Sequence, residues 1–427
     1  MKLFAGAGCG TIHFSESLFP IEGFCGIHDD PVVRVLALEC GEKVALISLE
    51  LVMLPQEMVE MVQEIVANRL GIIKEKIWVH TTHAITTPHA PHAPVGMGGV
   101  AQEISEEVKK DLDVKIQSYT KSVMDAVTQA ANAARQSFQP AVLGIGQAQS
   151  NILANRDVST DFGWWIGRSP TGKTNPNFDL LRLDGLDRKT IAIVVTGGLK
   201  PTTIDNSQMH ENKRLVSSDI PGLFCRLIEK EKAAPCLYFM GAAGDQVPCQ
   251  QALLDEVLSD GTVKTHDYGV AEGLNMVTRL GRQMLDDILP ELHRIHCTVD
   301  APEISIGKTH VKWGGKGRIQ MKPRKVLDFV QEREITIDGN ILTIGDLAFV
   351  GLKPEVNCIT AEELRQASVY ERTILISMVN GGQKYMPDIA SYHNITWEAQ
   401  SSMMMPGAAE AWVAAVAKKL LEMKGEK

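Results

Sequence analysis

Short apolar strands alternate with amphipathic helices along almost the whole of this 427-residue chain. The segments Val32–Leu38 and Lys43–Leu51 are typical of buried strands, and Pro55 opens a helix whose apolar side chains recur at helical spacing up to Leu70. No linker rich in Gly, Ser or Pro and no internal repeat interrupts this alternation. We therefore predict an α/β fold of mixed β-sheets flanked by helices, built as one large domain over residues 1–427.

The same periodicities predict the later elements. A long helix should end near Arg135, and a last amphipathic helix should span Pro406–Met423. Asp338-Gly339-Asn340 has the composition of a tight turn, so we predict a hairpin that joins Glu334–Ile337 to Ile341–Leu352. Residues 151–177 form the least regular stretch. The other predicted strands are Ala141–Gly146, Phe178–Leu183, Ile191–Thr196 and Leu237–Met240, and the other predicted helices are Asp219–Lys232 and Asp267–Ile288.

Composition restricts the classes of partner. The net charge is −9 and no run rich in Lys or Arg is present, which argues against nucleic acid or an anionic membrane surface as a partner. The apolar run at the N-terminus is too short for a signal peptide, and the eight cysteines show no Cys-x-x-Cys spacing. We expect a cytoplasmic protein with reduced thiols that acts on a small-molecule substrate. Homo-oligomer formation is left open.

Four of the twelve histidines lie between Trp78 and Pro94: His80, His83, His89 and His92. Neutral imidazole nitrogens suit zinc, so this density makes the segment a candidate for a metal site. Three prolines exclude a helix here, and any ligand would have to meet partners from elsewhere in the chain. The alternative is a polar, proline-rich loop with one hydrogen-bonded histidine. The residues of this segment leave both interpretations open.

Two segments have the spacing of phosphate-binding loops. Residues 167–174 match the Walker A pattern, but Asn175-Pro176-Asn177 blocks the helix that a P-loop needs, and a predicted strand follows. Gly6-Ala-Gly8-Cys-Gly10 has only five residues before it and no helix after it. We do not predict a nucleotide site at either segment.

Seven segments follow one another in the order found in the N-terminal domain of neutral ceramidases, which the chain resembles over nearly its whole length. They are Gly6-Ala-Gly8, the strand from Gly26 to Leu38, Ile47-Ser-Leu-Glu-Leu, Thr82-His83 before Pro88, Ser218-Asp219-Ile-Pro-Gly222, Phe239 to Pro248, and Gly351-Leu-Lys-Pro-Glu355. The resemblance implies a zinc-dependent amidase-type hydrolase fold whose metal is held by two histidines, a glutamate and a tyrosine. Ceramidases continue into an immunoglobulin-like domain, which this sequence does not include.

Carried over by position, the resemblance implies an incomplete ligand set. His83 takes the place of one metal-binding histidine, Glu355 that of the glutamate and Tyr385 that of the tyrosine. Lys200 stands where the second histidine is expected. We hypothesise that His210, in a segment that is longer than its counterpart, supplies the missing zinc ligand; the alternative is an exposed loop histidine. With His210 as the ligand, Lys200 would bind a substrate carboxylate or phosphate. Alternatively, the chain has lost the metal.

The nucleophile implied by the resemblance is also missing. A serine is expected at the position of Val247, and valine cannot attack a carbonyl. Hydrolysis would then use water whose pKa the metal lowers to about 7, with Asp245 accepting or returning the proton. Asp245 has an equally good interpretation as a cap in a glycine-rich turn. Arg34, in an otherwise apolar strand, is a candidate for an internal ion pair or a substrate clamp.

Three function classes follow from these residues. The first is a cytoplasmic zinc-dependent hydrolase of an amide, lactam or ester bond in a small polar substrate, with ceramide itself a poor substrate. The second is a relative that binds an anionic small molecule through Lys200 and Arg34 and performs non-hydrolytic chemistry. The third is a binding protein without enzymatic activity on an inherited fold.

Overall fold

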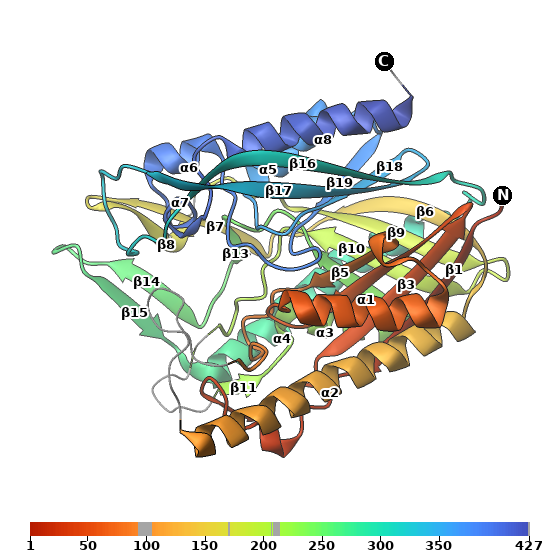
Figure 1. Ribbon diagram of the computed structural model, residues 1–427, viewed down its shortest axis with the longest axis horizontal. Coiled ribbons are helices and arrows are strands. Elements are labelled where there is room, and N and C mark those ends of the chain that lie inside the picture. Colours follow the sequence, from red (N-terminus) through yellow and green to blue (C-terminus); the bar gives the residue numbers. More distant parts are fainter. Residues whose placement is uncertain (93–104, 170, 206, 208–213, 426–427) are drawn as a thin grey trace.

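A mixed eight-stranded sheet forms the centre of the molecule. The computed structural model describes residues 1–92, 105–169, 171–205, 207 and 214–425 (Figure 1). The strand order is β12 (Cys236–Met240), β10 (Thr190–Gly197), β9 (Asn177–Gly185), β6 (Gln139–Gln149), β1 (Phe4–Thr11), β3 (Val32–Cys40), β4 (Glu42–Leu49) and β5 (Ile77–Thr81). All neighbours are antiparallel except β4 with β5 and β10 with β12. The predicted mixed α/β fold is confirmed.

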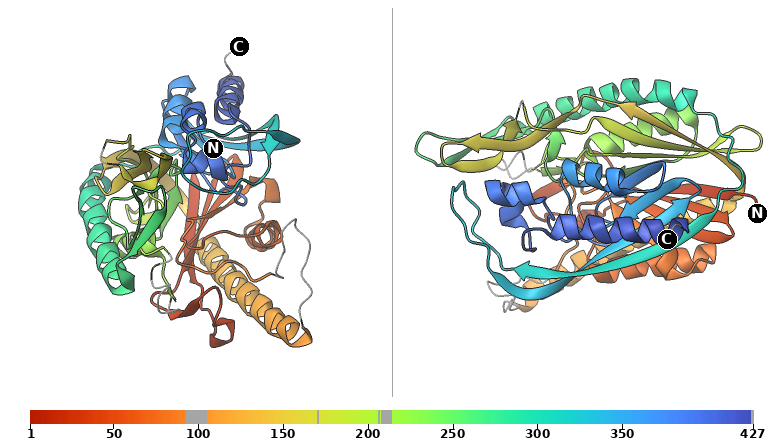
Figure 2. Two further views of the ribbon diagram at one scale, coloured as in Figure 1. Left: turned by 90° about the vertical axis from the view of Figure 1, so that its left-hand side faces the viewer. Right: turned by 90° about the horizontal axis from the view of Figure 1, so that it is seen from above.

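A second, four-stranded sheet packs on one face of the central sheet. Its strands are β16 (Ile304–Lys316), β17 (Gln331–Ile344), β18 (Leu347–Gly351) and β19 (Arg372–Ile376). Leu36 and Trp78 of the central sheet share one apolar core with Leu342 and Phe349 of the second sheet. The outer face of the second sheet is covered by α5 (Cys358–Ala367) and α8 (Ala408–Lys424), as Figures 1 and 2 show.

Helices cover the other face of the central sheet in two groups. One group is α1 (Gln56–Leu70) and α2 (Glu106–Gln136), and the other is α3 (Asp219–Lys232) and α4 (Gly269–Arg294). Side chains of β3 alternate between the two faces: Val33 and Val35 pack toward α1 and α2, whereas Leu36 and Leu38 face the second sheet. The result is a sandwich of four layers, in the order helix, sheet, sheet, helix (Figure 2).

The glycine motif near the N-terminus has a packing function. Gly6, Gly8 and Gly10 lie on β1 directly beneath α2, and a Cβ atom on any of them would lie 2.0–2.4 Å from a carbonyl oxygen of that helix. Only glycine permits so close an approach of helix and strand. The motif therefore lets α2 pack on the central sheet.

Smaller elements lie beside the two sheets. A three-stranded sheet contains β7 (Leu153–Thr160), β8 (Gly163–Ser169) and β13 (Gln246–Pro248), and a separate hairpin contains β14 (Leu253–Val257) and β15 (Val263–Asp267). The remaining described elements are β2 (Phe24–Ile27), β11 (Arg214–Val216), α6 (Ile389–Asn394), α7 (Trp397–Ser401) and the 3-10 turns Glu16–Leu18 and Lys74–Lys76. None of the helices formed by the described residues has the length and apolar character needed to cross a bilayer.

The predicted hairpin at residues 338–340 is wrong. β17 continues through Gly339, which pairs with Thr309 of β16, and the chain reverses only at Gly345 before β18. Trp412 donates its indole N–H to the carbonyl oxygen of Asp338 at 3.3 Å. The turn preference of Asp338-Gly339-Asn340 is therefore overridden, because β16 pairs with this segment and α8 packs on it.

The stretch 151–177, expected to be irregular, contains the hairpin of β7 and β8. Polar residues such as Arg156 and Asp157 hide the alternation that usually marks a strand. Arg156 is buried here because it pairs with Glu398 from a distant segment. The Walker-like segment begins inside β8 and is followed by the strand β9. Its surroundings therefore differ from those of a P-loop, as expected.

Candidate functional site

Four polar side chains from distant parts of the chain meet at the ends of three strands: His83, Lys200, Glu355 and Tyr385. His83 follows β5, Lys200 follows β10 and Glu355 follows β18. Tyr385 is held beside Glu355 by the backbone, because the N–H of Glu355 donates to the carbonyl oxygen of Lys384 and the N–H of Met386 donates to that of Glu355, both at 2.8 Å. We call these four residues the Lys200 cluster.

The ammonium of Lys200 joins the two oxygen-bearing members of the cluster. It forms an ion pair with Oε2 of Glu355 and donates to the hydroxyl of Tyr385 at 3.0 Å. The other carboxylate oxygen, Oε1, lies 3.3 Å from Nε2 of His83. Lys200 is 2 % exposed and Glu355 3 %, whereas the side chain of His83 is 16 % exposed. The cluster is therefore buried and opens to solvent at His83.

The orientation of the His83 ring follows from one hydrogen bond. Its Nδ1 lies 2.8 Å from the carbonyl oxygen of Val52, which can only accept, so Nδ1 must carry a proton. In the neutral ring Nε2 is the unprotonated nitrogen, and its 3.3 Å contact with the carboxylate oxygen Oε1 of Glu355 becomes a hydrogen bond only when Nε2 is protonated. The backbone of His83 has a φ of 62°, a conformation that few residues other than glycine, Asn, Asp and His adopt. The loop therefore places a basic nitrogen at the open edge of the cluster.

The charges around Glu355 keep it ionised. Burial by itself would raise the pKa of this carboxyl, but the Lys200 ammonium, followed by His83, outweighs burial and holds the pKa well below its usual range. At neutral pH the cluster therefore contains a carboxylate paired with an ammonium.

A second charged pair supports the aromatic ring of Tyr385. The guanidinium carbon of Arg156 lies 5.2 Å from the centre of that ring and 5.0 Å from the centre of the Trp397 ring. Arg156 is held there by an ion pair with Glu398, in which Nε donates to Oε1 at 2.6 Å. Sequence patterns did not single out Arg156, because it lies in the strand that was expected to be irregular. The signal that could have identified Arg156 was a charged residue in a segment without the pattern of a solvent-exposed surface.

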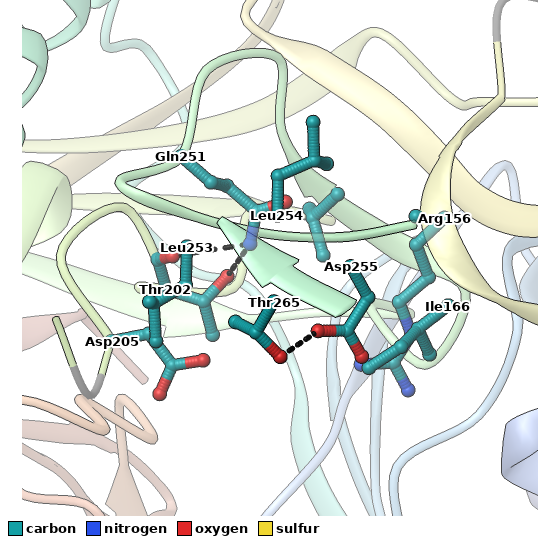
Figure 3. Close-up of a pocket in the computed structure, with 11 residues that line it drawn as sticks. Arg156, Ile166, Thr202, Asp205, Gln251, Leu253, Leu254, Asp255 and Thr265 are labelled. Atoms are coloured by element: carbon teal, nitrogen blue, oxygen red, sulfur yellow. Dashed lines mark hydrogen bonds between the residues drawn. The ribbon is translucent and has the colours of Figure 1, made fainter. Parts of the chain in front are cut away.

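A polar cavity lies beside Arg156 and Thr202, which contact Tyr385 and Lys200, although no member of the Lys200 cluster lines it. It has a volume of about 250 Å³, and Figure 3 shows Gln251, Asp255 and Thr265 on its other sides. Gln251 donates to the carbonyl oxygen of Thr202 at 3.2 Å, and Thr265 donates to Asp255 at 2.6 Å. A second cavity of about 450 Å³ continues between β8 and the hairpin of β14 and β15, sharing Asp255 with the first. The lining suits a small polar ligand.

Two solved structures with similar architecture are ceramidases. A ceramidase complexed with C2 superposes with a TM-score of 0.72 and 12 % sequence identity, over 100 % of this chain and 76 % of that chain. The neutral ceramidase from Pseudomonas aeruginosa gives a TM-score of 0.71 and 12 % identity, over 100 % and 75 % of the two chains. The chain has the neutral ceramidase fold. No profile of a protein family matches the sequence, and no curated protein matches it.

Within the ceramidase fold, the position that the resemblance assigned to a second histidine is occupied by Lys200, at the centre of the cluster. Among the residues that the structure describes, no three His, Cys, Asp or Glu side chains group closely enough to hold a metal ion. A protonated lysine has no lone pair to give a metal, and here it contacts both Glu355 and Tyr385. The described side chains therefore do not fit a zinc ion as long as Lys200 keeps this place.

The histidine-rich segment disperses in space. His80 is buried in the core, where Nε2 accepts from the N–H of Met240 at 3.0 Å, and burial lowers its pKa to about 3. His89 lies 3.2 Å from Glu22, and His92 lies beside the carbonyl oxygen of Ala90. Of the four, only His83 joins the cluster. His210, the hypothesised zinc ligand, lies outside the described residues.

Asp245 has the contacts of a structural cap. Its Oδ1 accepts from the N–H of Cys358, the first residue of α5, at 2.8 Å, and its Oδ2 accepts from Asn155 at 3.3 Å. Burial raises the pKa of Asp245 to about 6, although the hydrogen bonds from Cys358 oppose this shift. A catalytic role for Asp245 stays a prediction. Val247 lines the polar cavity with an apolar side chain.

Arg34 lies in a separate buried network. Its guanidinium pairs with Glu50 at 2.5 Å and with Glu229 through two nitrogens at 2.5 and 3.1 Å. We call these three residues the Arg34 cluster. Arg34 thus forms an internal ion pair, and the substrate-clamp role stays a prediction.

Proposed function

We propose that this chain is a hydrolase that cleaves an amide, lactam or ester bond in a small polar substrate. His83 acts as the general base, and Lys200 and Tyr385 donate hydrogen bonds to the substrate carbonyl oxygen. The observation that carries the proposal is the placement of His83, whose Nδ1 is fixed by Val52 so that Nε2 faces Glu355 at the open edge of the cluster. The ceramidase fold supports the same reaction class.

In the proposed reaction, Nε2 of His83 accepts a proton from water as the water oxygen attacks the carbonyl carbon. The tetrahedral intermediate then expels the amine or alcohol, which takes the proton back from His83. Glu355 is adjacent to Nε2 and stabilises the imidazolium that forms between these steps, since a carboxylate favours a neighbouring positive charge.

The negative charge that develops on the carbonyl oxygen needs donors. An ammonium has three N–H groups, of which one pairs with Glu355 and one donates to Tyr385. The Tyr385 hydroxyl accepts from Lys200 and so keeps its own O–H for the substrate oxygen. Donors fixed in a buried site cost no reorganisation when the charge appears, and this makes them effective.

The cavity beside Arg156 and Thr202 supports the proposed substrate class. A volume of about 250 Å³ accommodates a small molecule, and its lining offers hydroxyl, amide and charged groups. Val247 supplies no hydroxyl nucleophile at this wall. We therefore expect short, polar acyl compounds to be better substrates than a long-chain N-acyl sphingosine.

The anion-binding alternative has less support in the described residues. Lys200 already pairs with Glu355, and Arg34 already pairs with Glu50 and Glu229. Each cation is already neutralised by a buried carboxylate, so the full charge of an anionic ligand would stay uncompensated beside it.

The test is an assay of hydrolysis on a panel of small N-acyl amides, lactams and esters, with a ceramide included. Hydrolysis is measured as the release of amine or acid. For the best substrate, His83→Asn should lower kcat by roughly 10²–10⁴-fold because the general base is lost. Asparagine tolerates the left-handed backbone at this position. The matched control is His310→Asn, which removes an exposed histidine 2.7 Å from Asp338 and should leave kcat unchanged.

Two results would contradict the proposal. One is a wild-type protein that hydrolyses no member of the panel. The other is a His83→Asn variant that hydrolyses its substrate as fast as wild type.

A further inference from the structure

We infer that the Lys200 ammonium is the permanent cation of this site and stands where a divalent metal ion would have to bind, so that the site formed by His83, Lys200, Glu355 and Tyr385 excludes zinc. This inference deepens the proposed function and rests on it for the catalytic role of the cluster. It contradicts the expectation of a zinc site that the sequence resemblance implied.

The position of the ammonium carries the inference. Nζ contacts Oε2 of Glu355 and the hydroxyl of Tyr385, which are the two oxygen atoms that a metal at this place would use. It also lies 4.8 Å from the centre of the Tyr385 ring. With Lys200 2 % exposed, the ammonium cannot move into bulk solvent without opening the packed site. A metal ion and this ammonium would therefore compete for the same ligands.

The charge balance of the site agrees with this assignment. The charges of the Lys200 ammonium and the Glu355 carboxylate cancel, and neither His83 nor Tyr385 brings a second carboxylate to the site. Adding a divalent ion beside the ammonium would leave two uncompensated positive charges in a buried place. Burial of unpaired charge is strongly unfavourable.

The backbone places Lys200 rigidly. Directly before it, the N–H of Leu199 donates to the hydroxyl of Tyr238 at 3.1 Å, and that hydroxyl donates to the carbonyl oxygen of Leu199 at 2.8 Å. Directly after it, the N–H of Thr202 donates to the carbonyl oxygen of Lys200 at 2.9 Å. Tyr238 and Thr202 are themselves buried. The lysine is thus built into the core at the end of β10.

The experiment is zinc binding to the purified full chain, measured by calorimetric titration and by metal analysis after dialysis, together with melting temperatures in zinc and in chelator. Wild type should retain no stoichiometric zinc, and its melting temperature should be the same in zinc and chelator. Lys200→His replaces the ammonium by a nitrogen ligand and leaves His83, Glu355 and Tyr385 in place. Its zinc affinity should exceed that of wild type by at least about 100-fold, since repulsion between the ammonium and a divalent ion is removed.

Two further variants control this comparison. Lys200→Met removes the charge without adding a ligand, and zinc should raise its melting temperature because the metal would compensate Glu355. Lys173→His makes the same change at an exposed lysine that pairs with Glu362, and it should bind no more zinc than wild type.

Wild-type protein that binds one zinc ion per chain, and whose melting temperature falls in chelator, would overturn the inference even if Lys200→His does not fold. That result would leave the proposed hydrolase function standing with a metal. Conversely, failure to hydrolyse any substrate would overturn the proposed function without affecting the zinc measurement.

Discussion

The Lys200 cluster and the Arg34 cluster each hold a buried cation against carboxylate, but they differ in which polar atoms remain available to a substrate. Arg226 also approaches Glu50 of the Arg34 cluster, at 3.6 Å. Arg34 is 1 % exposed and reaches Glu50 and both oxygens of Glu229. Although burial opposes its charge, Glu50, followed by smaller contributions that include Glu229, holds the pKa of Arg34 above its ordinary value. The Lys200 cluster also contains a histidine and a phenol, and it opens to solvent at His83.

This difference separates a structural ion pair from a reactive one. In the Arg34 cluster the donors face carboxylates, so the network links β3 to α3. In the Lys200 cluster one ring nitrogen and one hydroxyl retain the capacity to exchange a proton or donate to a substrate. Burial and charge pairing by themselves therefore do not identify an active site. Four predictions test this distinction.

The largest expected effect is on stability, from Arg34→Met. Removing the guanidinium leaves Glu50 and Glu229 without their shared cation, which should lower the free energy of unfolding by about 3–5 kcal/mol. Activity per folded molecule should stay at the wild-type level. Urea unfolding and active-site-normalised kinetics measure the two quantities, and a loss of kcat in the folded variant would show that the two clusters are not functionally distinct.

Tyr385→Phe should show the opposite pattern. It keeps the ring that packs against Trp397 at 5.4 Å and removes only the hydroxyl that Lys200 contacts. We expect kcat to fall by roughly 10²–10³-fold, as for loss of one oxyanion donor, with the unfolding free energy changed by less than about 1 kcal/mol. Unchanged kcat would remove Tyr385 from the reaction, and a loss of bound zinc in this variant would support the metal site instead.

The next prediction concerns acid stability. The pKa of Glu355 is lowered in the folded chain from its ordinary value of 4.5, because Lys200 outweighs the effect of burial. Above pH 4.5 this stabilisation is fully present. As pH falls below 4.5 the unfolded state binds the proton first, so the unfolding free energy should decrease by about 1.4 kcal/mol per pH unit from this group.

Glu355→Gln cannot take up that proton, so the decrease of its unfolding free energy below pH 4.5 should lack the contribution of this group. At pH 7 the variant should be less stable than wild type, because Lys200 lacks its counter-charge. Unfolding curves at several pH values between about 3 and 7 compare the unfolding free energies of the two proteins. Identical slopes below pH 4.5 would mean that the Lys200 pair does not persist in solution.

The smallest expected effect is from Asp245→Asn. The amide oxygen can still accept from the N–H of Cys358, so a capping role predicts a loss of at most about 1 kcal/mol and an unchanged kcat. A pronounced fall in kcat, with the melting temperature preserved, would assign Asp245 to the reaction and extend the active site beyond the Lys200 cluster.

Local patterns predicted most of the architecture. The strands β3, β4, β9 and β10 and the helices α1, α3 and α8 lie within a few residues of the predicted bounds, because each buries a regularly spaced apolar face. Prediction failed where tertiary contacts replaced local signals. Gly339 stays within β17 because β16 pairs with it. Arg156 lies inside β7 because Glu398, from a distant segment, balances its charge.

The sequence by itself determined the layered α/β class, because apolar periodicity is a local property, and its resemblance to neutral ceramidases named His83, Lys200, Glu355 and Tyr385 as candidates. Only the tertiary structure decided how they meet. Lys200 and Tyr385 are 185 positions apart, and their contact exists because β10, β5 and the second sheet end at one place. That packing puts an ammonium between the carboxylate and the phenol, a relation that no local pattern encodes, since local patterns report burial and periodicity but not which side chains share a site.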